Sequence, residues 1–260
     1  MPLAKPSGGI EELVDETSGK EIVATPVVVD QFKSLTKKYE EFLGTYNRER
    51  WTTDHVPEVV LPCDISLFLQ STHDYEDHLD YPMCTGLFIS QLIQNSYEAG
   101  NNNFEIDVNS LKIIDNLAYN ISGTEERMVR IVIKGKVGHD CGSKAEHSTF
   151  TIEKAGKYCG FKAENSTFTM KEAGNGCGQY TKHSTFTIEK AGDWCGLWAK
   201  NSTFTIGETE DQCGSNAYYS TFKTHNPLQY ERFKKYVPED SGNSLYLLSQ
   251  NGSILKGGEW

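Results

Sequence analysis

Five cysteines recur at steps of 18 residues in the second half of the chain, each followed by glycine: Cys141, Cys159, Cys177, Cys195 and Cys213. In a structure of stacked coils they would form one column, with neighbours about 4.8 Å apart. Metal or redox chemistry is one interpretation of such a column. However, a straight row of thiols cannot surround a tetrahedral zinc ion, and parallel Cβ directions disfavour disulfides. We therefore predict a structural ladder of buried, reduced thiols.

A second group with chemical potential is the segment 73–80, which packs two histidines and four carboxylates into eight residues. Imidazole and carboxylate groups are ligands for divalent cations, so His73, Asp77 and His78 are candidate metal ligands. Metal-assisted hydrolysis is then the enzymatic alternative for this protein. A solvated acidic loop has the same composition and is the competing interpretation.

Other catalytic signatures are missing from the sequence. It contains no P-loop, no H-E-x-x-H and no dinucleotide-binding glycine pattern in its required context, so we assign no catalytic residue and no cofactor. The net charge of -11 repels phosphate backbones, which argues against nucleic acid as a partner. No apolar run reaches the roughly 20 residues that span a bilayer, and the first residues do not resemble a signal peptide. We expect a cytoplasmic protein without membrane contact.

Threonines recur with the same 18-residue period, one on each side of a phenylalanine. The pairs are Thr149 and Thr151, Thr167 and Thr169, Thr185 and Thr187, and Thr203 and Thr205. If the phenylalanine points inward, both threonines of each pair point outward and form two parallel columns on a flat face. We predict that this face is an interaction surface. Such T-x-T arrays resemble the ice-binding faces of β-solenoid antifreeze proteins, which makes ice binding a further alternative.

These recurrences belong to one repeat, close to G-x-x-C-G-x-x-A-x-x-S-T-F-T-I-x-x-A, present in five copies between residues 139 and 226. A unit of 18 residues is too short for paired helices but fits one coil of a β-solenoid. A left-handed hexapeptide helix is excluded because a step of six residues from Phe150 leads through Gly156 to Lys162. Alternating Phe and Ile predict one strand per coil and an inward ladder of Phe150, Phe168, Phe186, Phe204 and Phe222.

The glycine-rich spacing around Gly135–Gly142 and Gly192–Gly196 resembles the coils of the GXGXG superfamily. That superfamily includes the C-terminal domain of glutamate synthase and the C subunit of formylmethanofuran dehydrogenase. The resemblance covers roughly residues 110–220. It implies a right-handed parallel β-helix that serves as a structural domain and carries no catalytic residues.

We predict a mainly β protein with four parts. Residues 1–25 form a flexible N-terminus, 26–103 a small α/β cap region, 104–226 the β-helix and 227–260 a C-terminal cap made of a helix and a hairpin.

Within the N-terminal cap, we expect Asp30 to cap a helix that carries Phe32, Leu35, Tyr39 and Phe42 on one face. A second amphipathic helix is expected around Leu87–Tyr97.

In the C-terminal cap, Asn226-Pro227 is a helix-start signal, and Leu228, Phe233 and Tyr236 are predicted to share one face of that helix. The sequence Asn251-Gly252 predicts a type I′ hairpin turn.

The function we predict is a non-enzymatic scaffold or subunit that presents a repetitive face to another protein or to a second copy of itself. Apart from the threonine columns, the aromatic residues Tyr158, Tyr180, Trp194 and Trp198 are candidates for partner contact. A corner of the coil that faces only water does not require large aromatic side chains.

Overall fold

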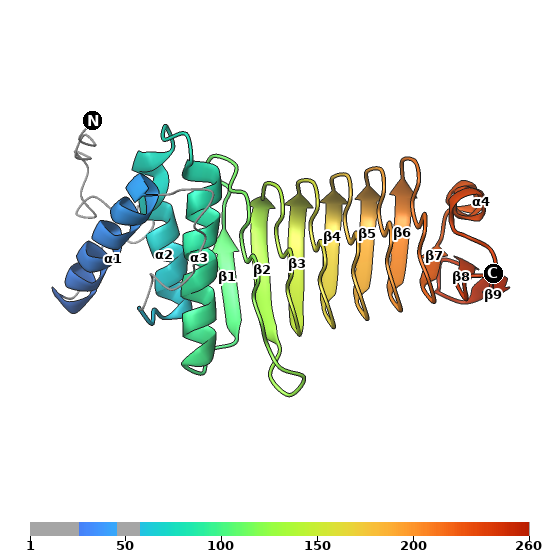
Figure 1. Ribbon diagram of the computed structural model, residues 1–260, viewed down its shortest axis with the longest axis horizontal. Helices are drawn as coiled ribbons and strands as arrows, with labels where there is room; N and C mark the ends of the chain where they lie inside the picture. The colour runs from blue at the N-terminus through green and yellow to red at the C-terminus, as the bar shows by residue number, and fades with distance from the viewer. Residues whose placement is uncertain (1–25, 46–57, 260) are drawn as a thin grey trace.

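A computed structural model describes residues 26–45 and 58–259 of the 260-residue chain. The predicted flexible N-terminus, residues 1–25, lies outside these ranges. The molecule is elongated, with a helical layer at one end, a β-solenoid in the middle and a helix with a hairpin at the other end (Figure 1). No helix among the described residues is both long and apolar enough to cross a lipid bilayer.

The solenoid is built from parallel strands that follow each other in chain order in a single sheet (Figure 1). This arrangement confirms the predicted parallel β-solenoid. The strands are β1 (Asn103–Asp107), β2 (Val129–Lys136), β3 (Ser148–Ala155), β4 (Thr167–Ala173), β5 (Thr185–Ala191), β6 (Thr203–Thr209) and β7 (Thr221–Thr224). The strands of the exact repeat, β3 to β7, pair in register at steps of 18 residues, so that equivalent residues of successive coils lie side by side.

The centre of the solenoid is a column of stacked phenylalanine rings. Ring centroids are 4.6 Å apart between Phe150 and Phe168 and 5.2 Å apart between Phe204 and Phe222, and these rings are nearly parallel. All five rings of the predicted ladder are fully buried. Because each ring removes a large apolar area from water, about 1.5–3 kcal/mol per residue, this column is a main source of stability.

The remaining half of each coil returns to the sheet through a closely hydrogen-bonded path rather than through open loops. Its backbone N–H groups donate to carbonyls of neighbouring coils, for example from Asp140 N to Lys157 O at 2.9 Å and from Lys144 N to Phe161 O at 2.7 Å. Several of its residues have positive φ, including Asp140 and Lys144. The loop side of the solenoid is therefore also an ordered, repeating surface.

The N-terminal cap consists of α1 (Pro26–Thr45), α2 (Pro62–Ser71), the short 3-10 helix η2 (Thr72–Tyr75) and α3 (Tyr81–Glu98). The expected α/β region is thus helical, since residues 58–102 contain no strand. Asp30 lies inside α1 and not at its start, so it was wrong to predict it as the cap. The predicted apolar faces are confirmed: α1 buries Phe32, Leu35 and Tyr39, and α3 buries Leu87, Phe88, Leu92 and Ile93.

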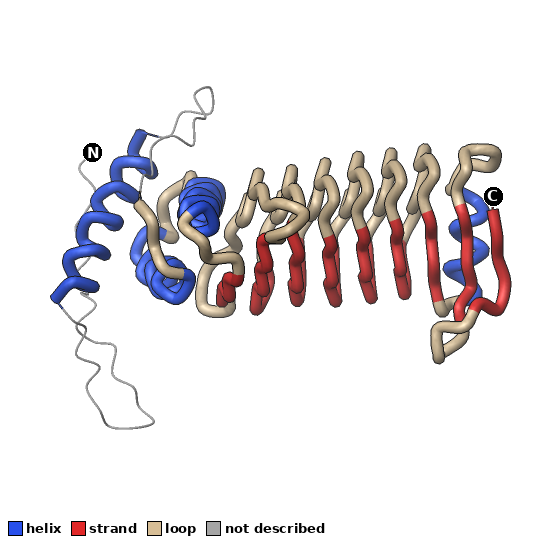
Figure 2. The backbone as a smooth tube through the Cα atoms, turned by 90° about the horizontal axis from the view of Figure 1, so that it is seen from below, coloured by secondary structure: helices blue, strands red, loops and turns tan. Residues whose placement is uncertain are grey.

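The helical layer is packed tightly against the first coil (Figure 2). Gly86 of α3 lies so close to the loop that follows β1 that a Cβ atom there would be 1.8 Å from the carbonyl oxygen of Asp115. Helix α2, which contacts β1, and α3, which contacts the loop after it, therefore cover the first coil together.

The C-terminal cap consists of α4 (Pro227–Tyr236) and a hairpin of β8 (Ser244–Leu248) and β9 (Ile254–Glu259). The predicted N-cap is confirmed, because Asn226 Oδ1 accepts hydrogen bonds from the N–H groups of Leu228 and Gln229. The buried face differs from the prediction: Leu228 is exposed, while Gln229, Tyr230 and Phe233 are buried.

The hairpin is present, but its turn is not type I′. Gly252 has a φ of +84°, whereas Asn251 lacks the positive φ that this turn requires. Instead, Ser249 N donates to Ser253 O at 2.8 Å and closes a wider loop.

Candidate interaction surfaces

The acidic segment 73–80 does not form a compact ligand set. Lys112 is paired with Asp77, with 2.7 Å between Nζ and Oδ1, and this contact lowers the pKa of the Asp77 carboxyl. His78 Nδ1 accepts a hydrogen bond from Asp80 N, and the His73 side chain is exposed. Across the described ranges, no group of three or more His, Cys, Asp or Glu side chains is arranged to hold a metal ion. The structure does not bring His73, Asp77 and His78 together in such a group.

The threonine columns run along the outer face of the sheet. Thr149, Thr167, Thr185, Thr203 and Thr221 are aligned by the strand register, and so are Thr151, Thr169, Thr187 and Thr205. Their side chains are exposed or half-buried, while the phenylalanine between the two threonines of each strand is buried. The flat face that the sequence predicts is therefore present.

Beside the threonines lie columns in which the sign of the charge changes between coils. Lys154 Nζ is 2.9 Å from Glu172 Oε1, and Lys171 Nζ is 3.6 Å from Glu153 Oε1. The hydrogen bond from Lys154 lowers the pKa of Glu172. Exposed pairs of this kind contribute little stability, but like charges in adjacent coils would oppose the native register.

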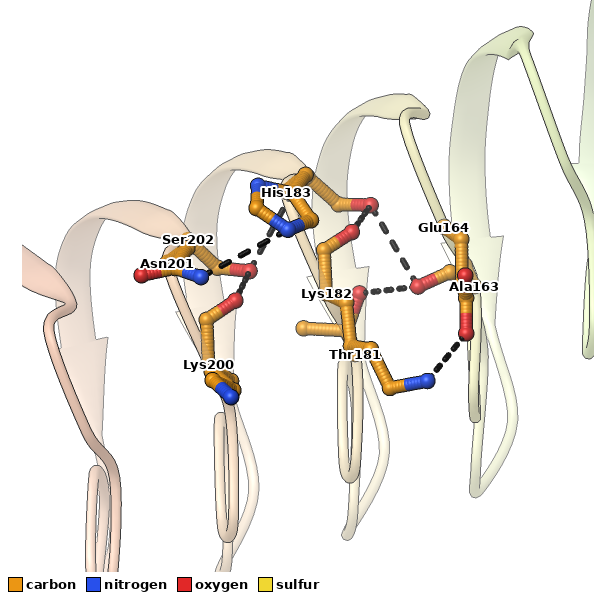
Figure 3. A network of polar contacts seen from close by, with 9 residues as sticks. Ala163, Glu164, Thr181, Lys182, His183, Lys200, Asn201 and Ser202 are labelled. Carbon is orange, nitrogen blue, oxygen red and sulfur yellow. Dashed lines mark hydrogen bonds and ion pairs between the residues drawn. The ribbon is translucent and has the colours of Figure 1, made fainter.

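On the return path, polar side chains connect successive coils in the same way (Figure 3). Lys182 Nζ contacts Glu164 Oε1 at 2.5 Å, and the buried Thr181 hydroxyl donates to Ala163 O at 2.7 Å. The His183 and Asn201 side chains approach each other at 3.5 Å. These polar contacts link neighbouring coils to each other.

An exposed row of aromatic rings crosses four coils on the return path; we call it the aromatic row. Its ring centroids are separated by 5.7–6.3 Å from one member to the next, and the Tyr180 and Trp198 rings are parallel within 1°. Its members are Tyr158, Phe161, Tyr180, Trp198 and Tyr218. Tyr180, Trp198 and Tyr218 are 41–42% exposed.

Sequence reasoning identified Tyr158, Tyr180 and Trp198 of this row but missed Phe161 and Tyr218. The remaining candidate, Trp194, is 37% exposed and occupies the column of Tyr158, one position before the cysteine. The 18-residue period could have placed all of these residues on the return path. It could not show that Phe161 and Tyr218 extend the row, because they occupy different columns from Tyr180 and Trp198.

All four aromatic candidates from the sequence have left-handed backbone conformations, with φ between +58° and +61°. Bulky side chains are rare in this region, where glycine and asparagine cost less. Glycine and asparagine, which adopt positive φ with less strain, occupy the equivalent positions in other coils. Gly176 lies in the column of Tyr158 and Trp194, and Asn216 lies in the column of Tyr180 and Trp198. Backbone geometry alone does not account for the aromatic residues.

The cysteine column is buried at every coil, with at most 2% of any side chain exposed. All five cysteines are free thiols. Burial raises the pKa of Cys177 and of Cys213, which keeps these groups protonated at neutral pH. The cysteines therefore form the buried column that the sequence predicts, without disulfides.

No family model matches the chain, and searches of curated proteins and of solved structures returned no match.

Proposed function

We propose that the solenoid is a non-enzymatic scaffold that binds a protein partner, or a second copy of itself, through the aromatic row. The observation that carries this proposal is the display of large rings at left-handed positions. A bulky residue in a strained backbone conformation, at a position where glycine or asparagine would be less strained, points to a function. Exposed Tyr and Trp are also the residue types that dominate protein interfaces.

The surroundings of the row favour a partner with acidic side chains. Lys162 lies over the Phe161 ring, with 5.1 Å between Nζ and the ring centroid. Lys200 precedes the left-handed Asn201 in the coil that carries Trp198 and is exposed. These two ammonium groups are the observation that favours an acidic partner, although the chain as a whole is acidic. The resemblance to GXGXG domains, a prediction from sequence, also agrees with a structural role.

The test compares the wild-type protein with the double variant Tyr180→Asn/Trp198→Asn. Asparagine tolerates positive φ, so this variant removes two rings without disturbing the coil. The control is Thr185→Asn/Thr187→Asn on the opposite face. Affinity purification with mass spectrometry and light scattering measures partner recovery and self-association. We expect a stoichiometric complex with the wild type and the control, and its loss in the aromatic variant.

The proposal fails if the wild-type protein is monomeric and recovers no stoichiometric partner. It also fails if the aromatic variant recovers the same complex as the wild type.

Ice binding by the threonine face is the second candidate, and the alignment of its two columns supports it. Hydroxyls two residues apart on a strand are separated by roughly 6.7 Å and those of neighbouring coils by roughly 4.8 Å, which gives a regular array. A measurement of thermal hysteresis would distinguish the two candidate functions. If the threonine face binds ice, the wild-type protein should show thermal hysteresis and Thr185→Lys should abolish it. Ice growth equal to that in buffer for both proteins would eliminate this function.

A further inference from the structure

A groove of about 440 Å³ runs along one corner of the solenoid, at the carboxyl ends of β2, β3 and β4, where the arrowheads lie in Figure 1. We call it the corner groove. Three small buried side chains line it, those of Val137, Ala155 and Ala173. Ile113, from the loop after β1, also lines it and is 46% exposed. Because small-molecule sites have volumes of roughly 300–1,000 Å³, the corner groove has room for a small organic molecule.

The charge of the corner groove is opposite in sign to that of the whole chain. Three exposed lysines line it: Lys136, Lys154 and Lys157. Among the described lining residues, Glu172 carries the only carboxylate, and its Oε1 is 2.9 Å from Lys154 Nζ. Three ammonium groups and one carboxylate leave two positive charges in the groove. The chain as a whole has a net charge of -11, so this excess is local.

The strand register leaves the positive charge of the groove without protein partners. Lys154 lies beside Glu172 on one neighbouring strand but beside Lys136 on the other. Farther along the same column the sign alternates, with Glu172 beside Lys190. Neither Lys136 nor Lys157 forms an ion pair with any described residue. Like charges side by side on neighbouring strands repel each other, and an anion in the groove would offset this repulsion.

The column of residues after the corner adds uncharged donors. Lys157 N donates to His139 Nδ1 at 3.0 Å, so the neutral imidazole carries its proton on Nε2 and is a donor there. Asn175 follows Lys157 in the next coil, and its backbone N–H finds no such acceptor, because the lysine ammonium only donates. In the described part of the chain this N–H has no hydrogen-bond partner. His139 and Asn175 both line the corner groove.

We propose that the corner groove binds a small organic phosphate monoester. Such a group carries close to two negative charges at neutral pH and three strong acceptor oxygens. These properties match the two positive charges and the N–H donors of the groove. The exposed Ile113 side chain contacts the organic part, a contact that a free phosphate ion does not make. The groove contains no member of the aromatic row, so this proposal does not depend on the proposed function.

The test titrates the full-length protein with phenyl phosphate, inorganic phosphate and benzoate. Calorimetry measures each Kd, and NMR of the ¹⁵N-labelled protein follows the backbone amide of Asn175. The groove variant, Lys136→Gln/Lys157→Gln, removes two ammonium groups from the site. The matched control, Lys200→Gln/Lys223→Gln, removes two lysines that do not line the groove. Circular dichroism verifies that both variants fold.

We expect phenyl phosphate to bind the wild type at one saturable site and to shift the Asn175 amide. Its affinity should fall about tenfold or more in the groove variant, which loses two charge-assisted contacts, and should be unchanged in the control. Inorganic phosphate should bind more weakly because it lacks the contact with Ile113. Benzoate, with a single negative charge, should be the weakest of the three ligands.

The proposal is overturned if the Asn175 amide does not shift, or if the two double variants bind phenyl phosphate equally. Equal affinities for benzoate and phenyl phosphate would overturn the recognition of phosphate. Equal affinities for inorganic phosphate and phenyl phosphate would overturn the assignment to an organic phosphate. If the groove variant does not fold, Lys157→Gln alone replaces it, with an expected loss of about threefold.

Discussion

At the residue scale, aromatic side chains serve two purposes, one inside the solenoid and one on its surface. The phenylalanines of the inner ladder are fully buried and stacked, whereas Tyr180 and Trp198 expose about two fifths of their surface at left-handed positions. The inner rings stabilise the fold through burial. The outer rings gain little from burial and carry backbone strain, so their removal should affect stability very differently.

We expect Phe186→Ala to lower the free energy of unfolding by about 3–5 kcal/mol, because it opens a cavity in the centre of the ladder. Trp198→Asn should change it by less than about 1 kcal/mol, because relief of strain at φ +59° offsets the lost ring contacts. Urea unfolding followed by circular dichroism measures both values. A loss of several kcal/mol in Trp198→Asn would show that the outer rings are structural.

At the element scale, the helical cap depends on a close approach that one glycine permits. Gly86 of α3 faces the backbone of the first coil at Asp115, without space for a Cβ atom. Gly44 of α1 has open space instead, since among the described residues no group outside the backbone of its own helix turn and its chain neighbours lies within 4 Å of the point that its Cβ atom would occupy. It is therefore a matched helical control.

Gly86→Ala should push α3 off the solenoid and cost about 1–3 kcal/mol, as overpacking does. Gly44→Ala should be neutral or slightly stabilising, because alanine favours the helix. Thermal unfolding gives the stability difference, and hydrogen exchange shows whether α3 loses protection. Equal behaviour of the two variants would contradict the tight contact seen at Asp115.

At the scale of the whole molecule, the repeat should make the solenoid divisible in units of one coil. Deletion of residues 173–190 joins Glu172 to Ala191 and keeps every inward column in phase. We expect this variant to fold, to be shorter by about one strand spacing of 4.8 Å, and to be somewhat less stable.

Deletion of nine residues, 173–181, is the matched control and should not fold, since it puts inward and outward columns out of phase. X-ray scattering and circular dichroism distinguish the outcomes. If both deletions behave alike, the coils are not independent structural units.

The sequence by itself determined the solenoid because its interactions repeat. Each coil meets an equivalent coil above and below, so periodicity in Phe150 and its equivalents translates directly into the register that the strands adopt. The same reasoning placed the threonines outside and the cysteines inside. The helix start at Asn226 was also predictable, because its hydrogen bonds are local.

Only the tertiary structure decided the features that depend on contacts between distant, non-repeating segments. Helix α2 is a short helix whose Ile65, Phe68 and Leu69 are buried in the cap, and the sequence analysis, which expected an α/β region here, did not identify it. Likewise, Lys112 pairs with Asp77 from 35 residues away, a contact that local sequence cannot predict. The aromatic row also needed the folded coil, because ring contacts between different columns depend on backbone direction and not on spacing in the sequence.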